Sequence, residues 1–260
     1  MPRQLFVSLL PAHIDETRLE NNLAVVIDVL RASTTACAAL SQGAKRIIPF
    51  ASIEDARRFA SRLTESGETP LLCGERGCIR IEGFDLGNSP FEYTPEAVAN
   101  RTLLFTTTNG TRGLMAVAKA RWSAMGGFAN LSAIVDRLAR EQGDIHLVAA
   151  GTDGRITLED ALAAGAIAQA LRDRESTLEP ANDEAHISLT LNNQYNTPEL
   201  RLQALAQSTG GQNLRRLGLD NEIAFCAQLD TYPIVPILEN SALTADTPLP
   251  GDQPADDWSI

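Results

Sequence analysis

Residues 23–40 read LAVVIDVLRASTTACAAL, an apolar run followed without a break by a segment of small residues. The first part, 23–29, is rich in valine and isoleucine and is interrupted only by Asp28, so it predicts a buried strand. The segment that follows has the pattern of a helix start. A strand that leads directly into a helix is the repeating unit of α/β proteins with a parallel sheet.

Other parts of the chain repeat this alternation. Between them, helical patterns occur, such as the one that Ser52 can cap and that buries one apolar stripe. We therefore predict an α/β fold, a three-layer α/β/α arrangement with a largely parallel sheet. Further strands are predicted near 5–10, 46–49, 70–73, 102–106, 122–125 and 144–150.

A weak internal repeat suggests how the chain is organised. Val26, Thr35, Leu40, Gly43 and Ala44 recur 122 residues later as Val148, Thr157, Leu162, Gly165 and Ala166. This spacing is consistent with two similar halves, 1–120 and 121–240, although two strand-to-helix units can also look alike by chance. The last segment, 241–260, carries four aspartates and three prolines and no base. Its composition predicts a disordered acidic tail.

The composition limits the classes of partner. The chain has 260 residues and a formal net charge of −11, which argues against nucleic acid or an anionic membrane as the main partner. No apolar stretch reaches the roughly 18–20 residues of a membrane span. Four cysteines without a CxxC pair fit a cytoplasmic protein. A homodimer is possible, and the sequence does not decide it.

Four segments combine charged residues with glycine at the ends of predicted strands. They are 27–35, 74–90, 106–113 and 150–160. In open α/β sheets, ligands bind beyond the carboxyl ends of the strands, where loops lead into helices. We therefore predict one shared pocket formed by all four segments.

The same four segments hold four arginines, Arg31, Arg76, Arg112 and Arg155. Guanidinium groups and helix N-termini both favour phosphate, sulfonate and carboxylate groups, so the pattern indicates a small anionic ligand. Each arginine could instead pair with a neighbouring acid as a structural ion pair.

A run of hydroxyl and amide side chains lies where a helix is expected to begin. It consists of Thr106, Thr107, Thr108, Asn109, Gly110 and Thr111, and Gly151 holds a comparable place after a later strand. These groups resemble a phosphate-binding loop, although the Walker lysine is missing. An ordinary Thr/Asn helix cap is the alternative.

Acidic side chains in the predicted pocket require a cation. An anionic ligand is repelled by carboxylates unless a positive ion lies between them, so a hard divalent ion such as Mg²⁺ is implied. The candidate ligands are Asp28, Glu75, Asp85, Glu159 and Asp160. Glu159 and Asp160 could instead stabilise a helix as first-turn acids.

Five segments of the chain resemble the 2-phosphosulfolactate phosphatase family, in the same order and up to about Ile237. They are VVIDVLRASTT, GERGCIRIEGFDLGNSPFEY, TTTNGTRG, AGTDGRITLEDALAAGA and LGLDNEIAFCAQLDTYPIVP. The resemblance implies a Mg²⁺-dependent hydrolase that removes phosphate from (2R)-2-phospho-3-sulfolactate, a step of coenzyme M biosynthesis. It also implies an α/β fold of two related halves.

The family's invariant polar residues correspond by resemblance to Asp28, Arg31, Glu75, Arg76, Asp85, Asn88, Asn109, Glu159 and Asp160. The hypothesis of a metal-dependent phosphatase gives several of them roles. Asp28 is implied as the nucleophile or as a Mg²⁺ ligand, and the sequence leaves both open. The other implied catalytic residues are Arg31 and Arg76, which stabilise the phosphoryl oxygens, and Asn88 and Asn109, which orient them.

Two departures from the family pattern bear on substrate identity. Ala149 and Ala150 replace a cysteine that usually precedes the AGT sequence, and Gly210 stands where the family often has histidine. A non-catalytic protein that senses a phosphorylated or sulfonated acid is the alternative function, as is a phosphatase for another phosphorylated hydroxy acid.

Overall fold

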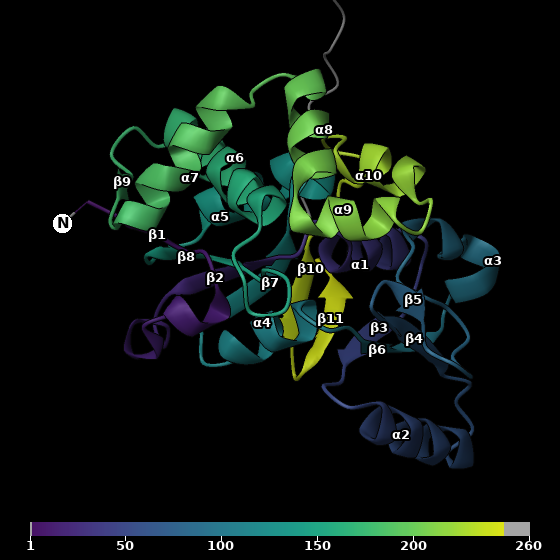
Figure 1. The fold of residues 1–260 in the computed structure, drawn as a ribbon. Helices are drawn as coiled ribbons and strands as arrows, with labels where there is room; N and C mark the ends of the chain where they lie inside the picture. Colours follow the sequence, from purple (N-terminus) through teal and green to yellow (C-terminus); the bar gives the residue numbers. More distant parts are fainter. Residues whose placement is uncertain (1, 247–260) are drawn as a thin grey trace, which may run out of the picture.

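The structure is a computed structural model, which describes residues 2–246. Strands and helices alternate along most of this part of the chain (Figure 1). The strands are β1 (Gln4–Ser8), β2 (Leu23–Ile27), β3 (Arg46–Pro49), β4 (Leu71–Arg76), β5 (Ile79–Arg80), β6 (Thr102–Thr106), β7 (Trp122–Gly126), β8 (Ile145–Ala149), β9 (Glu179–Pro180), β10 (Pro236–Glu239) and β11 (Ala242–Ala245). The helices are α1 (Ala32–Ser41), α2 (Ile53–Glu65), α3 (Pro95–Val98), α4 (Gly110–Ala116), α5 (Leu131–Arg140), α6 (Leu158–Arg174), α7 (Asp183–Gln194), α8 (Pro198–Gln207), α9 (Thr209–Arg215) and α10 (Asp220–Cys226).

The strands form one mixed sheet in the order β5-β4-β6-β3-β11-β10-β7-β2-β8-β1-β9. Two groups of parallel strands, β4-β6-β3 and β7-β2-β8-β1-β9, lie on either side of the antiparallel hairpin β10–β11. The hairpin is yellow in Figure 1. The predicted α/β fold with largely parallel strands is confirmed.

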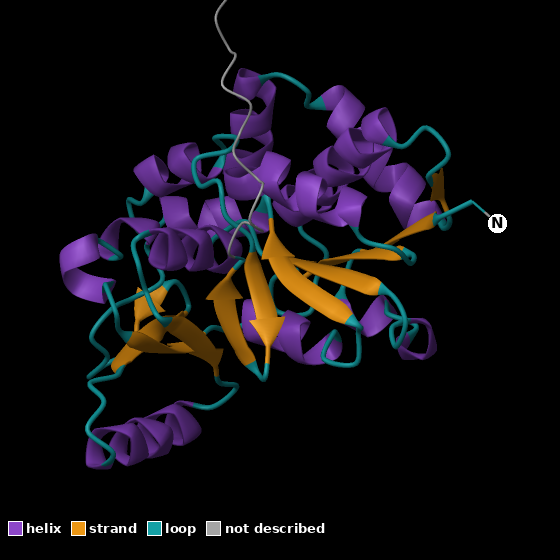
Figure 2. Ribbon diagram, turned by 180° about the vertical axis from the view of Figure 1, so that it is seen from behind, coloured by secondary structure: helices purple, strands orange, loops and turns teal. Residues whose placement is uncertain are grey.

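The hairpin also sets the relative direction of the two groups. Three antiparallel pairings separate β3 from β7, so the two groups run in opposite directions along the sheet. Figure 2 shows them at different angles. The carboxyl ends of β6 and β2 nevertheless meet, because Gly110, at the start of α4, packs against Ala32, at the start of α1.

Helices cover both faces of the sheet (Figure 2). Side chains alternate between the faces of a strand, so neighbouring residues of β2 belong to different cores. Leu23, Val25 and Ile27 pack with apolar residues of α5 and α6. Ala24 and Val26 pack with α1 and α4 in the second core. All five residues of β2 are buried, which explains the continuous apolar run that predicted it.

The prediction of a disordered tail from residue 241 onward is wrong for its first residues. Residues 242–245 form β11, and Leu243 is fully buried opposite Ile47 of β3. The acidic and proline-rich composition of the whole segment concealed this short apolar run. The remainder of the predicted tail, 247–260, lies outside the described residues.

The predicted halves are interleaved in the sheet. β1 and β2 come from the range 1–120, yet they pair with β8, and β2 also pairs with β7. The repeated residues Val26 and Val148 are direct neighbours in the register of β2 and β8. The two strand-to-helix units therefore lie side by side, and the division into halves stays a prediction.

Within residues 2–246, no helix is both long and apolar enough to cross a membrane.

Gly165 permits the close approach of α6 and α7. A Cβ atom at this position would lie 1.9 Å from the backbone oxygen of Ser188. Helix propensity alone favours alanine over glycine by about 1 kcal/mol, but the overlap with backbone forces α7 to move, at a cost of roughly 2–3 kcal/mol.

We expect Gly165→Ala to lower the free energy of unfolding, measured by urea denaturation. Ser61→Ala, on the exposed face of α2, is the matched control, because it improves helix propensity without a packing cost. A Gly165→Ala protein that is more stable than the wild type would show that the two helices are not held this closely.

Candidate active site

The loops that follow β2, β4, β6 and β8 enclose one cavity of about 220 Å³. Asp28 follows β2, and Glu75 and Arg76 end β4. The prediction that Asp28 and Glu75 share a pocket is therefore confirmed. The lining residues are Asp28, Leu30, Arg31, Glu75, Arg76, Gly77, Cys78, Asn88, Thr107, Thr108, Asn109, Thr152, Asp153, Gly210 and Asn213.

Asp28 is the first residue of the loop between β2 and α1. The residue is 7% exposed, and its Oδ1 accepts a hydrogen bond of 3.2 Å from the backbone N–H of Ala32. The Oδ2 atom faces Gly110, where a Cβ atom would lie 3.0 Å from it. Glycine at position 110 therefore lets the chain after β6 pass close to the carboxylate.

Glu75 connects the loop after β4 with the loop after β6. Its Oε1 accepts hydrogen bonds of 3.0 Å from both the backbone N–H and the hydroxyl of Thr108. Its Oε2 accepts one of 2.8 Å from the backbone N–H of Cys78. Glu75 is 8% exposed, and hydrogen bonds hold both of its carboxylate oxygens in place.

Arg31 is buried beside Asp28. Its Nη1 donates to Glu222 Oε2 of α10 at 2.5 Å, and its Nη2 donates to the backbone oxygen of Cys78 at 2.9 Å. The alternative of a structural ion pair is therefore partly right for Arg31, which has an acidic partner and also lines the cavity.

The threonine-rich loop after β6 contributes hydroxyl groups to the cavity and to its own stability. Thr107 Oγ1 accepts a hydrogen bond of 3.2 Å from the backbone N–H of Thr111 in the first turn of α4, whereas the side chain of the N-cap residue Asn109 makes no cap hydrogen bond. Asn109 Oδ1 accepts one of 3.2 Å from the backbone N–H of Asp153. Thr107, Thr108 and Asn109 line the cavity, so both predicted functions of this loop, capping and lining, are compatible.

Glu159 and Asp160, at the start of α6, have different surroundings. Asp160 accepts hydrogen bonds from the backbone N–H groups of Val29 at 2.8 Å and Gly151 at 3.0 Å, so it joins two loops. Glu159 is 2% exposed, and its buried Oε2 has no hydrogen-bond partner. A Cβ atom at position 210 would lie 2.3 Å from Glu159 Oε1, so Gly210 leaves space for this carboxylate.

Several predicted site residues do not line the cavity. Asp85 is exposed, and its Oδ2 accepts a hydrogen bond from the backbone of Leu72 at 2.8 Å, so it stabilises the start of β4. Arg112 and Arg155 are also exposed. The predicted group of four arginines is thus reduced to Arg31 and Arg76 at the cavity. The remaining predicted residues outside its lining are Gly110, Thr111, Gly151, Glu159 and Asp160.

The structure adds lining residues that the sequence did not single out. Cys78 holds both Glu75 and Arg31 through its backbone, and its own φ is +67°. Asn213 belongs to α9, far along the chain, as does Gly210, which the sequence marked only as a departure from the family pattern. Asn88, which was predicted, has a buried Oδ1 without a hydrogen-bond partner. The late segment that resembles the family already contained Glu222, although no role was assigned to it.

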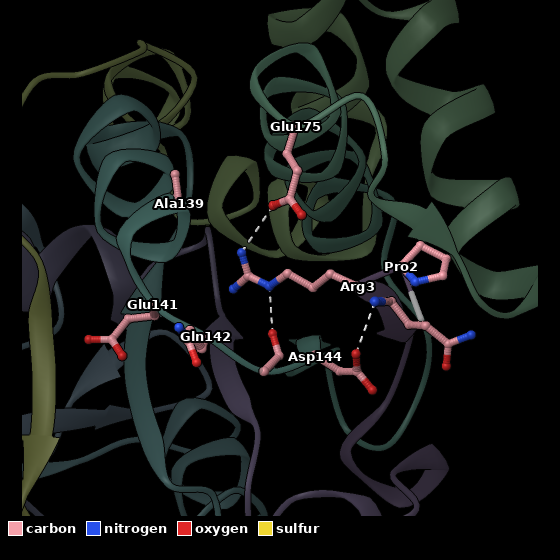
Figure 3. A pocket seen from close by; sticks show the side chains of 9 residues that line it. Pro2, Arg3, Ala139, Glu141, Gln142, Asp144 and Glu175 are labelled. Carbon is pink, nitrogen blue, oxygen red and sulfur yellow. Dashed lines mark hydrogen bonds and ion pairs between the residues drawn. The ribbon is translucent and has the colours of Figure 1, made fainter.

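A larger hollow, of about 660 Å³, lies at the amino ends of β1 and β8 (Figure 3). Its charged groups already have partners. Arg3 donates to Glu175 at 3.2 Å and to the backbone oxygen of Gly143 at 2.5 Å, and Asp144 accepts from the backbone of Gln4 at 2.9 Å. None of the predicted site residues lines this hollow. We therefore regard the smaller cavity as the candidate active site.

Burial, together with the charges of Glu75 and Glu159, raises the pKa of Asp28 from the usual 3.8 to about 7, although the hydrogen bond from the Ala32 amide and the charge of Arg31 lower it. Burial likewise raises the pKa of Asp160, with Glu159 and Asp28 as additional causes. Burial also raises the pKa of Glu159. Asp28, Glu159 and Asp160 are therefore three buried carboxyl groups that influence one another, and they retain protons or require a compensating cation.

The raised pKa of Asp28 predicts a pH dependence of stability. Between about pH 4 and pH 7 the folded protein binds more protons at this group than the unfolded chain, so the contribution of Asp28 to stability decreases as pH rises through this window. The decrease is on the order of 2–4 kcal/mol, since one pH unit corresponds to about 1.4 kcal/mol.

Urea denaturation in the presence of EDTA measures this effect. Because other acids also titrate, wild type is compared with Asp28→Asn at each pH. We expect the variant to gain stability relative to wild type between pH 5 and pH 8. A constant difference across this range would contradict the raised pKa.

The fold and the cavity define an α/β protein with a pocket lined by acidic, basic, hydroxyl and amide side chains at the ends of its strands. The chain belongs to the 2-phosphosulpholactate phosphatase family, a family of phosphoric monoester hydrolases, whose model matches residues 8–241.

Three relatives illustrate the similarity, and each carries the name probable 2-phosphosulfolactate phosphatase. The protein of Caldanaerobacter subterraneus is 40% identical over 87% of this chain and 92% of its own length. The protein of Thermotoga maritima is 40% identical over 85% of this chain and 91% of its own length. That of Synechococcus sp. is 42% identical over 84% and 89%.

Proposed function

We propose that the protein hydrolyses (2R)-2-phospho-3-sulfolactate to sulfolactate and phosphate with the help of Mg²⁺, a reaction of the type used in coenzyme M biosynthesis. The observation that carries the proposal is the position of Asp28. This buried carboxylate follows a central strand and lines a cavity together with Arg31, Glu75 and several hydroxyl and amide groups. Family membership supports the same reaction class.

The residues at the cavity fit a hard divalent cation. Asp28 and Glu75 line it, and the buried oxygens Glu159 Oε2 and Asn88 Oδ1 have no hydrogen-bond partner. In residues 2–246 no group of three or more His, Cys, Asp or Glu side chains has the arrangement of a complete metal site. Mg²⁺ commonly uses only one or two carboxylates together with water and substrate phosphate, so this set suits it.

We assign Asp28 and Glu75, two buried carboxylates that line the cavity, as those that would hold the ion. When bound, Mg²⁺ would neutralise negative charge on the phosphate oxygens. Asp85 is no longer a candidate, because it stabilises the start of β4 away from the cavity.

The chain's own groups account for substrate binding. Arg31 and Arg76 are the cationic side chains of the cavity, and we assign them to the anionic oxygens of the substrate. Asn88, Thr107, Thr108 and Asn109 supply hydroxyl and amide groups that can orient the phosphate. Hydrolysis breaks the phosphorus–oxygen bond, and water supplies the new oxygen of inorganic phosphate and the proton of the sulfolactate hydroxyl. Asp28 is either the nucleophile or a Mg²⁺ ligand in this scheme.

Phosphate release from a panel of phosphorylated acids tests the proposal. With Mg²⁺ present, we expect kcat/KM for 2-phospho-3-sulfolactate to exceed that for 2-phospholactate, which lacks the sulfonate, by about tenfold or more, since one charged contact contributes on the order of 1.4 kcal/mol or more. Equal values would show that the sulfonate is not recognised. Binding of these acids without any phosphate release would favour a sensor protein.

A further inference from the structure

Glu222 is a buried acid that does not line the cavity but contacts a residue that does. It lies on α10, and its Oε2 accepts the hydrogen bond of 2.5 Å from Arg31. The two side chains are 5% and 3% exposed. Charge-assisted hydrogen bonds of this kind are short and directional, and burial protects them from competition with water.

The second contact of Arg31 restricts the guanidinium group further. Nη2 donates to the backbone oxygen of Cys78, whose N–H in turn donates to Glu75. A guanidinium group has five N–H donors, and these two bonds use one donor on each terminal nitrogen. Three N–H donors remain beyond these two bonds, and Arg31 lines the cavity.

Helix α10 is itself firmly held, which makes Glu222 a fixed point. The ring of Phe225 packs against Phe91 with centroids 4.9 Å apart and against Tyr232 at 6.2 Å. Ile223 and Cys226, on the same helix, are buried in the core beside α6 and α9. An acid on such a helix can impose one position on the side chain that it binds.

We propose that Glu222 is a positioning residue that orients Arg31 toward the phosphate group of the substrate. The inference rests on the proposed function, because that function supplies the phosphate as the target of Arg31. Glu222 acts only through Arg31 and does not touch the ligand.

A double-mutant cycle tests the dependence on Arg31. Glu222→Asp keeps the charge but shortens the side chain, so any loss comes from geometry and not from a changed potential. We expect it to lower kcat/KM about tenfold and to weaken binding of inorganic phosphate, measured calorimetrically with Mg²⁺, by about threefold or more. In the Arg31→Ala background the same substitution should cause no further loss in either quantity.

Two more variants complete the design. Glu175→Asp is the matched control, because it shortens the acid of another ion pair, the one with Arg3 at the amino ends of β1 and β8. It should leave kcat/KM and phosphate affinity within about twofold of wild type. If Glu222→Asp does not fold, Glu222→Gln replaces it and is expected to lower kcat/KM only when Arg31 is present.

The outcomes separate the two proposals. Equal losses with and without Arg31, or no loss at all, would overturn the positioning role of Glu222. If wild type binds phosphate with the expected pattern in the cycle but hydrolyses no phosphate ester, the proposed function fails while the role of Glu222 stands.

Discussion

Asp28→Asn is expected to lower kcat/KM for 2-phospho-3-sulfolactate by about 10³-fold or more. Asparagine has nearly the same size and retains an oxygen that can accept the hydrogen bond of Ala32. It lacks the negative charge that both a nucleophile and a Mg²⁺ ligand require. Initial rates of phosphate release with Mg²⁺ measure the effect.

Asp85→Asn is the matched control for this prediction. Asp85 is an exposed acid of the same glycine-rich segment as Glu75, and the substituted side chain can still accept the hydrogen bond from Leu72. Its activity should stay within about twofold of wild type. An Asp28→Asn enzyme that keeps a tenth or more of the wild-type kcat/KM would remove Asp28 from the reaction.

The two possible roles of Asp28 require a separate measurement. Single-turnover hydrolysis in ¹⁸O-water gives one part of the answer: label in the Asp28 carboxylate would show that an aspartyl-phosphate forms and that water attacks its carbonyl carbon. Label in phosphate alone means that water attacks phosphorus, either in the substrate or in an aspartyl-phosphate. Denaturation during turnover gives a more direct answer. Phosphate on the peptide that contains Asp28, labile to hydroxylamine, would identify the nucleophile.

Removal of divalent cations is expected to abolish activity. With EDTA, phosphate release should fall below about 1% of its initial rate, because the buried carboxylates then repel an anionic substrate without compensation. Addition of excess Mg²⁺ should restore the rate.

EDTA that has been saturated with Mg²⁺ beforehand is the control, and it should leave the rate unchanged. Full turnover in metal-free EDTA would contradict the assignment of a cation to Asp28 and its neighbours. Thermal denaturation of the same samples shows whether the protein stays folded without the ion.

Much of the fold could be predicted because several strands form continuous apolar runs. The predicted ranges 46–49 and 102–106 coincide with β3 and β6, and all five residues of β6 are buried. Among the elements that were not predicted, two escaped this reasoning for clear physical reasons. Helix α7 has a mostly polar sequence and buries only a few small or apolar side chains, and β11 is too short to stand out from the acidic segment around it.

Site residues could be predicted where they directly follow a strand, because the end of the strand fixes their position. They could not be predicted in the longer loops, where the direction of the side chain determines whether it reaches the cavity. Asp28, Glu75 and Thr107 follow strands and reach the cavity. Asp85 and Arg155 are in the same loops, but their side chains are exposed, and periodicity carries no information on loop conformation.

Residues that reach the site from distant helices were missed for another reason. Glu222 lies 191 positions after its partner Arg31, and Asn213 reaches the cavity from α9. Contacts of this kind depend on how α9 and α10 pack against the loop after β2. A local pattern in the sequence cannot specify that packing.

The central claim is that the cavity between Asp28, Arg31 and Glu75 binds the phosphate group and the cation together. A crystal structure with orthovanadate and Mn²⁺ in place of Mg²⁺ tests it most directly, because the anomalous signal of manganese locates the ion. We predict vanadate at Arg31 and the threonine-rich loop, with Mn²⁺ beside Asp28. Vanadate and Mn²⁺ bound only elsewhere, for example in the hollow around Arg3, would contradict the account.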